Sequence, residues 1–332
     1  MILALFCRKR TDVLSDLQCG HPAVPGAPPE PPGWVGALLG RGVVGFRAEP
    51  DGLELRLLAR GRFALASARV RGALALDEGA FRERAVAAYA RIRETLAPLR
   101  ARQVVRMWNF IPRILGPLGR FPQRYMAFND ARYRALAAWE RGDSAPGSVI
   151  AASGVGHDGD DLVVHALATI GGGRAVENPR QVAAYRYSAR YGSLPPCFAR
   201  ATLVPAAPRR HWLLVSGTAS VRGEDSMHAG DLHGQAYETL DNLSSLVGAA
   251  RAAVGQTDGD QELAQDGLAR GDGCLWRFRH LRVYYVEAAR REEVAAVVGR
   301  AFRRALTLEV VRADLCRPEL LVEIEGLAEL GG

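Results

Sequence analysis

Lysine is nearly absent from this 332-residue chain: Lys9 is the only lysine among 43 basic residues, and the other 42 are arginines. A phosphate-binding loop, a pyridoxal-phosphate Schiff base or a lysine general base would therefore depend on Lys9, whose sequence context fits none of these sites. Two further motifs are missing. The three glycines at 171–173 lack the spacing of a dinucleotide-binding loop, and Ser216 lacks the two flanking glycines of a nucleophile elbow. These absences exclude several large classes of enzymes.

Long apolar runs and paired cysteine motifs are also lacking. No stretch approaches the ~18 uncharged apolar residues that a membrane-spanning helix needs. The basic residues Arg8–Arg10 follow the first apolar residues, which is the wrong order for a secretory signal. The five cysteines are an odd number without CxxC spacing. We therefore expect a cytoplasmic protein with reduced thiols and no membrane partner.

Basic residues exceed acidic residues, which gives a formal net charge of +7. The arginines are scattered among 36 acidic residues, a pattern typical of solvated helix faces rather than of a nucleic-acid-binding surface. Arginine is also the side chain best shaped to hold a carboxylate through two hydrogen bonds. The composition therefore favours an acidic small molecule as the partner and argues against a nucleic acid.

The pattern of apolar residues predicts two mixed units of strands and helices. Residues 20–34 are too rich in proline for regular structure. Elsewhere, apolar periodicity predicts strands within 35–75, 149–152, 162–167, 211–216, 281–286 and 320–325, and helices over 78–100, 124–139, 231–253 and 292–306. We expect an α/β (α+β) protein with an N-terminal strand and proline-rich loop (1–34), a first unit with extra helices (35–205) and a second unit (206–332).

Two glutamates in the closing strand are candidate functional residues. Glu323 and Glu325 alternate with apolar residues, so both carboxylates project from the same face of the strand. Two interpretations remain open: an acidic face toward solvent, or buried carboxylates that are costly and therefore functional. In contrast, His228, Asp231 and His233 are typical of the polar start of a helix rather than of a metal site, so we expect no metal.

A second candidate cluster combines arginine with tyrosine. Residues 180–191 contain three residues of each type. If Tyr185–Tyr187 is extended, its two tyrosines share one face and Arg186 projects from the other. Arg200 follows at the start of another β run. This composition suits a site that holds an acid.

Three segments of the second half resemble the small trimeric YjgF/RidA family of enamine and imine deaminases: 215–221, 228–243 and 322–326. In that family, the first glutamate of a terminal Glu-Ile-Glu motif lies in the active site, and an arginine in a Pro-x-Arg-Ser/Ala-x-Val strand binds the substrate carboxylate. The matching residues here are Glu323 and Arg200, and we expect Arg200 to close the first unit. The resemblance implies tandem YjgF/RidA-like units that form a pseudo-oligomeric, barrel-like core with helices packed outside.

The chain resembles the longer chorismatases more closely than the small YjgF/RidA proteins, and this resemblance runs from about residue 100 to 326. The motifs that carry this resemblance are 107–112, 124–132, 151–156, 177–182, 184–187 and 217–220. One departure is Ala131, where the family usually has a glycine. The resemblance implies an enzyme that cleaves the enol ether of chorismate and releases pyruvate without a metal or an organic cofactor. Because a fused chain internalises the interfaces of its smaller relatives, we expect a monomer.

The resemblance also assigns roles to individual residues. Glu323 would be the general acid that protonates the enolpyruvyl methylene. Arg200 would hold a substrate carboxylate. Arg186 and Tyr187, which cluster just before the same strand, are expected to hold the carboxylates with it, and Arg132 is a further candidate. Cys316, seven residues before Glu323, is typical of the hydroxybenzoate-forming relatives, with Ala229 as the small residue across the pocket. This thiol would exclude water and help to move the proton that is lost on aromatisation.

The product stays open at this point. Intramolecular attack by the neighbouring ring hydroxyl leads through an arene oxide to 3-hydroxybenzoate, and a related type also forms 4-hydroxybenzoate. Hydrolysing relatives let water attack and form a dihydroxycyclohexadiene acid. A non-catalytic protein of the same fold that only binds an acid is the remaining alternative.

Overall fold

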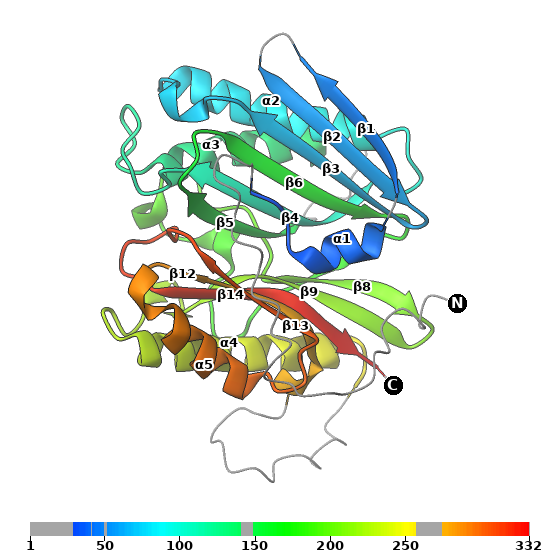
Figure 1. The fold of residues 1–332 in the computed structure, drawn as a ribbon, viewed down its shortest axis with the longest axis vertical. Coiled ribbons are helices and arrows are strands. Elements are labelled where there is room, and N and C mark those ends of the chain that lie inside the picture. Colours follow the sequence, from blue (N-terminus) through cyan, green and yellow to red (C-terminus); the bar gives the residue numbers. More distant parts are fainter. Residues whose placement is uncertain (1–28, 41, 50–51, 141–148, 257–273, 332) are drawn as a thin grey trace.

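The computed structural model describes residues 29–40, 42–49, 52–140, 149–256 and 274–331 (Figure 1). Most of the predicted N-terminal segment, residues 1–28, therefore lies outside the described residues. The helices are α1 (Gly33–Leu39), α2 (Glu78–Leu96), α3 (Arg124–Glu140), α4 (Leu232–Ala253) and α5 (Arg291–Ala301). The strands are β1 (Val43–Ala48), β2 (Leu53–Arg60), β3 (Phe63–Val70), β4 (Gln103–Pro112), β5 (Ala151–His157), β6 (Leu162–Thr169), β7 (Arg174–Val176), β8 (Ala201–Ala207), β9 (Arg210–Ala219), β10 (Val221–Arg222), β11 (Asp225–Ser226), β12 (Phe278–Tyr285), β13 (Thr307–Arg312) and β14 (Val322–Leu330).

The two halves of the chain share one topology. The first sheet has the order β1-β2-β3-β6-β4-β5 and the second has the order β7-β8-β9-β14-β12-β13. In each sheet the last pair is parallel, β4 with β5 and β12 with β13, and the other pairs are antiparallel. Each half also places a helix after its third strand and another after its fourth. The tandem arrangement of two α+β units is therefore confirmed.

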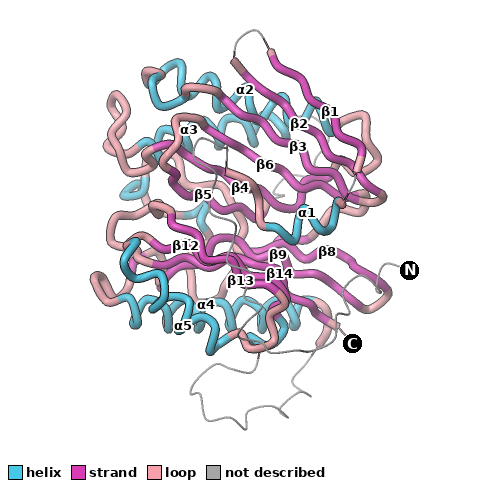
Figure 2. The backbone as a smooth tube through the Cα atoms, viewed as in Figure 1, coloured by secondary structure: helices cyan, strands magenta, loops and turns pink. Residues whose placement is uncertain are grey.

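The two sheets face each other, and helices cover their outer faces (Figure 2). One apolar core lies between the first sheet and α2 and α3, another lies between the second sheet and α4 and α5, and a third contains side chains from both sheets. The sheets therefore bury both of their faces, which explains strands such as β6 that are apolar at nearly every position. Trp34 of α1 belongs to the third core and contacts the Trp108 ring edge-on.

All four predicted helices formed, although α2 ends at Leu96 instead of residue 100 and α5 ends at Ala301 instead of residue 306. Residues Phe81, Ala85, Ala88, Tyr89 and Ile92 of α2 are all fully buried, as their spacing predicted. Asp231 caps α4 by accepting a hydrogen bond from Gly234 N at 3.0 Å, so the polar residues there start a helix. No helix in the described ranges combines the length and the apolar character needed to cross a membrane.

Two details of the sequence prediction differ from the structure. The boundary predicted between residues 205 and 206 falls inside β8, whereas sheet membership already changes between β6 and β7. Arg200 therefore lies within the second unit instead of closing the first, because it follows β7 and directly precedes β8, which pairs with β9. Residues 33–39, predicted to be loop and strand, form helix α1.

One edge of the first sheet joins the second unit directly. Backbone hydrogen bonds link Ala199 N to Ile150 O and Gly156 N to Asp314 O. Side chains of the second unit also accept hydrogen bonds from β5: Ala152 N donates to Ser216 Oγ at 3.0 Å. This joint brings β5 beside β9 and creates the seam at which the candidate site lies.

Candidate active site

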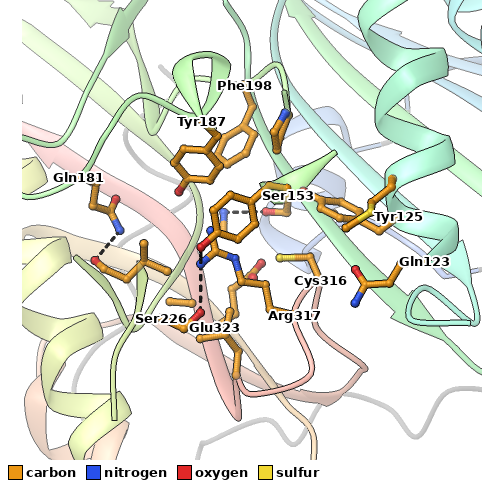
Figure 3. Close-up of a pocket in the computed structure, with 18 of the residues that line it drawn as sticks. Gln123, Tyr125, Ser153, Gln181, Tyr187, Phe198, Ser226, Cys316, Arg317 and Glu323 are labelled. Carbon is orange, nitrogen blue, oxygen red and sulfur yellow. Dashed lines mark hydrogen bonds between the residues drawn. The ribbon is translucent and has the colours of Figure 1, made fainter. Parts of the chain in front are cut away.

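A cavity of about 420 Å³ lies at the seam between the two units. Its walls come from β5, the start of α3, β9, residues 187–200 and the segment 316–323 that leads into β14 (Figure 3). The volume is in the range of pockets that bind small molecules. In the view of Figure 3, Tyr187 and Phe198 lie above Cys316, Arg317 and Glu323.

The closing strand turns its two glutamates toward the first unit. Val322 and Ile324 pack in the core beneath the second sheet, so Glu323 and Glu325 project from the opposite face. Both are buried, with exposed fractions of 4% and 1%. The alternative of a solvent-facing acidic strand is therefore wrong, and the structure supports the interpretation of two buried carboxylates.

Glu325 is surrounded by hydrogen-bond donors. Its carboxylate accepts hydrogen bonds from Arg106 Nη2 at 2.5 Å, Trp108 Nε1 at 3.0 Å, Tyr284 OH at 2.9 Å and the hydroxyl of Ser153. These four donors surround the carboxylate, and one of them is a guanidinium. Arg106 is buried to the same extent, so the two residues form a buried ion pair that joins β4 of the first unit to β14 of the second.

Glu323 lies in a contrasting environment. Among the residues that the structure describes, none donates a hydrogen bond to its carboxyl group. Burial raises the pKa of Glu323 to about 8, and the charge of Glu325 adds to this increase, while Arg106 and Arg200 oppose it. The carboxyl group lies against the backbone of Gly217, where a Cβ atom would overlap Oε1. Glu323 is therefore a protonated acid at neutral pH, at the edge of the cavity.

Gln235 of α4 fixes the segment that leads into Glu323. Its Nε2 donates to Glu319 O at 2.8 Å, and its Oε1 accepts a hydrogen bond from Leu321 N at 2.8 Å. Gln235 is fully buried, so this clamp is protected from water. It positions the start of β14 against the second unit's own helix.

Two buried arginines that line the cavity carry N–H groups without an acceptor among the described residues. Arg132 packs on the Phe198 ring, and its Nε and Nη2 find no acceptor in the described part of the chain. Arg200 donates through Nη2 to Tyr187 OH at 2.7 Å and to Val182 O at 2.8 Å, while its Nε is buried and has no acceptor among those same residues. Buried guanidinium groups with unpaired N–H donors are suited to bind anions.

A third guanidinium lies in the wall formed by the segment 316–323. Arg317 Nη1 donates to Glu224 O at 2.8 Å and to Ser226 Oγ at 3.0 Å, and its guanidinium lies 4.0 Å from the centre of the Tyr191 ring. Tyr191 OH in turn donates to Glu224 O at 2.6 Å. These contacts hold residues 189–191 against the β10–β11 hairpin and close one side of the cavity.

Cys316 is a free thiol that lines the cavity together with Tyr125. Burial raises the pKa of Cys316 to about 12, and the adjacent Glu323 contributes to the increase. A thiol with this pKa stays protonated at neutral pH, so the expected role in moving the aromatisation proton has no support here. What Cys316 offers the cavity is a small group that forms only weak hydrogen bonds.

Five of the seven predicted site residues line the cavity: Glu323, Cys316, Arg200, Tyr187 and Arg132. The other two lie outside the lining. Residues 184–186 form a 3₁₀ turn, so the condition of an extended segment is not met, and the exposed Arg186 stacks on Tyr185. Ala229 is exposed in the turn that precedes α4.

Several residues of the site were not predicted from the sequence. Arg106 and Ser153 come from the first unit, and Tyr125, Gly217 and Arg317 complete the walls around them. A charged residue inside the apolar run 104–112 was the signal that could have revealed Arg106.

Comparisons with known proteins connect this geometry to a family. A family model described as chorismatase FkbO/Hyg5-like, N-terminal, matches residues 55–168. A 3-hydroxybenzoate synthase of Streptomyces hygroscopicus is 34% identical over 254 residues, which cover 75% of this chain and 70% of the relative. The chain belongs to the chorismatase family. A chorismatase of Streptomyces rapamycinicus is 32% identical over 253 residues, with 76% and 71% of the two chains covered.

A solved chorismatase structure has the same fold. It superimposes with a TM-score of 0.69 at 26% sequence identity, over 87% of this chain and 80% of that chain. The agreement extends beyond residues 55–168 and includes both units. The resemblance to chorismatases that the motifs indicated is confirmed, and the chain is an enzyme of this family.

Proposed function

We propose that this protein cleaves chorismate to pyruvate and 3-hydroxybenzoate. The observation that carries the proposal is a buried glutamate, whose pKa burial raises to about 8, in a cavity lined by two guanidinium groups with N–H donors that have no acceptor among the described residues. Chorismate has two carboxylates to bind and one enol ether to protonate, so both features match its chemistry. The name 3-hydroxybenzoate synthase of the relative that is 34% identical supports the aromatic product.

The first step is protonation of the enolpyruvyl methylene by Glu323. The proton moves from the carboxyl oxygen to the terminal carbon, and positive charge develops on the ether carbon and oxygen. This weakens the bond between the ring carbon and the ether oxygen, which breaks as pyruvate leaves. Because Glu323 holds its proton up to about pH 8, the acid is available at neutral pH.

The second step is attack by the adjacent ring hydroxyl on the ring carbon that pyruvate leaves. The hydroxyl gives its proton to the Glu323 carboxylate, which the first step left ionised, and the new bond from the hydroxyl oxygen to the ring carbon closes an arene oxide. Opening of the oxide and loss of the ring proton give 3-hydroxybenzoate. The atoms of the two products sum to those of chorismate, so this route consumes no water, oxidant or organic cofactor. A second opening direction would give 4-hydroxybenzoate.

Arg200 and Arg132 hold the two carboxylates in this proposal. Arg200 is already oriented by Tyr187, and Arg132 is oriented by Phe198, so neither side chain needs to be ordered on binding. Cys316 occupies the wall beside Glu323 with a group that does not hold water well, which favours the internal hydroxyl over a water molecule. We further propose that one chain is sufficient for activity, because both walls of the cavity come from the same chain.

The test is to incubate the purified protein with chorismate and to measure pyruvate and aromatic products. We expect equal amounts of pyruvate and 3-hydroxybenzoate. In the Glu323→Gln variant, turnover should fall by about 10²–10⁴-fold with little change in the Michaelis constant, because glutamine cannot donate the proton. A dihydroxycyclohexadiene acid as the main product would indicate hydrolysis. Binding of chorismate without pyruvate release would indicate an acid-binding protein.

A further inference from the structure

The buried pair of Arg106 and Glu325 lies next to the proposed acid but does not line the cavity. Both residues are 1% exposed, and burying a pair of charges costs free energy unless the pair is well hydrogen bonded. The proposed reaction so far uses neither residue. Arg106 and Glu325 can therefore influence the reaction only through a neighbouring residue.

Two glutamates two positions apart on one strand face are about 7 Å apart along the backbone. At this distance in a buried site, two negative charges repel each other, so the second ionisation is strongly disfavoured. The donors decide which glutamate carries the charge. Glu325 accepts four hydrogen bonds, one of them from a guanidinium, and Glu323 accepts none from the described residues.

The contacts of Arg106 strengthen this assignment. Its Nη2 donates to Glu325 and to Ser153 Oγ at 2.6 Å, and its Nη1 donates to Met107 O at 2.6 Å. Ser153 Oγ also accepts a hydrogen bond from Gly217 N at 2.8 Å, and Gly217 is the residue against which the Glu323 carboxyl lies. The same network therefore holds the charge on Glu325 and shapes the surface that supports Glu323.

We propose that Glu325, held by Arg106, is a positioning residue that keeps Glu323 protonated and in place. The inference rests on the proposed function of Glu323 as the acid. Other ionisable groups also face Glu323 or its cavity: Arg106 of β4, Tyr125 and Arg132 of α3, Arg200 before β8, Tyr284 of β12, and Cys316, Arg317 and Glu319 before β14. Among all these groups, Glu325 is the one whose charge opposes the ionisation of Glu323 most strongly.

The test is the pH dependence of kcat/KM in the full-length Glu325→Gln variant. Removing this negative charge leaves Arg106 without its counter-charge, and both effects favour ionised Glu323. The alkaline limb of the profile should move to lower pH by about one unit or more, which is about a tenfold loss of activity above pH 8. The control is Glu329→Gln on the same strand, whose side chain pairs with Arg279 at the surface and should leave the profile unchanged. Glu325→Asp keeps the charge and should restore the limb most of the way.

An inactive fraction lowers the height of the profile without moving it, so poor folding does not imitate the expected result. If Glu325→Gln yields no folded protein, Tyr284→Phe serves instead, because it removes only one donor to Glu325 and keeps the ring. It should move the limb in the same direction by a few tenths of a pH unit. An unchanged limb in the variant that folds would overturn the inference.

The outcome separates this inference from the proposed function. If the wild-type protein releases pyruvate but its variants keep the wild-type limb, the inference fails and the proposed function stands. If the wild-type protein releases no pyruvate, the proposed function fails. Infrared difference spectra between wild type and Glu323→Gln then still report protonation of Glu323, and in the Glu325→Gln background the carboxyl band should disappear at lower pH. A band that disappears at the same pH in both backgrounds contradicts the inference.

Discussion

At the scale of single residues, the site separates two identical side chains by their surroundings. Glu325 meets four donors and carries the charge, and Glu323 meets none from the described residues and keeps its proton. A pair of titratable groups with opposite environments is a recurring sign of acid catalysis. This arrangement lowers the stability of the folded protein at neutral pH, because burial disfavours an ionisation of Glu323 that the unfolded chain allows.

This cost predicts that the Glu323→Gln variant is more stable than wild type at neutral pH. The pKa of Glu323 rises from about 4.5 in the unfolded chain to about 8 in the folded protein, so between these values the folded state holds a proton that the unfolded state has lost. The contribution of Glu323 to stability is therefore full below pH 4.5 and falls by about 1.4 kcal/mol for each pH unit up to pH 8. Thermal unfolding of both proteins between pH 5 and 8 checks this. The gap between their Tm values should widen with pH, and a constant gap would contradict the prediction.

Arg200→Lys should weaken substrate binding because an ammonium cannot reproduce the fork of a guanidinium that bonds both Tyr187 and a carboxylate. The Michaelis constant for chorismate should rise about tenfold or more, corresponding to about 1.4 kcal/mol or more. The matched control is Arg186→Lys, which changes an exposed arginine outside the cavity lining. Steady-state kinetics of the two variants compares them directly. An equal effect of both changes would remove Arg200 from the binding site.

Cys316→Ala should change the product more than the rate. A smaller side chain leaves room for a water molecule near the reacting ring carbon, while the acid Glu323 stays intact. Pyruvate release should stay within about tenfold of wild type, because the proton donor Glu323 is unchanged. Chromatography should show a shift from hydroxybenzoate toward the dihydroxycyclohexadiene acid. The same aromatic product in the same yield would show that Cys316 only fills space.

At the scale of elements, the Glu323 side chain of β14 lies directly against Gly217 of β9. A Cβ atom on Gly217 would overlap Oε1 of Glu323 and lie 3.2 Å from Ser153 Oγ. Gly217→Ala should therefore displace the Glu323 carboxyl and reduce turnover by about tenfold or more, since small misplacements of reacting groups are costly. The control is Gly248→Ala within α4, where an added Cβ meets nothing within 4 Å and should leave turnover unchanged. Turnover of Gly217→Ala equal to the control would show that the contact relaxes without consequence.

Local periodicity was sufficient to predict elements but not their partners. The apolar stripes of α2 and α4 and the alternation in β14 depend on neighbouring residues in the chain, so the sequence shows them. The conformation of residues 184–186 stayed open, because a short stretch of tyrosine and arginine has no period that separates a strand from a 3₁₀ turn. Helix α1 was missed for a related reason: its seven residues are too short for a helical stripe.

At the scale of the whole molecule, the candidate site depends on contacts that no local pattern predicts. Glu323, Cys316 and Arg200 came from a resemblance between motifs, and all three line the cavity. Arg106 and Ser153 were missed because their importance arises only when β4 and β5 meet the second unit, across about 170 or more residues of chain. The domain boundary was misplaced for the same reason, since sheet membership is decided by pairing between distant strands.

The shared topology of the two halves has a consequence for symmetry. Strand β6 occupies the place in the first sheet that β14 occupies in the second, but Leu162–Thr169 contains no carboxylate. In a symmetric assembly of identical chains, every substitution appears at all equivalent interfaces, so each would carry the same groups. A single chain with two copies of the fold escapes this constraint. Here the second half supplies the acid and the Arg200 guanidinium, while the first half supplies Arg132 and a hydroxyl. The result is one asymmetric site for a substrate whose two ends are themselves different.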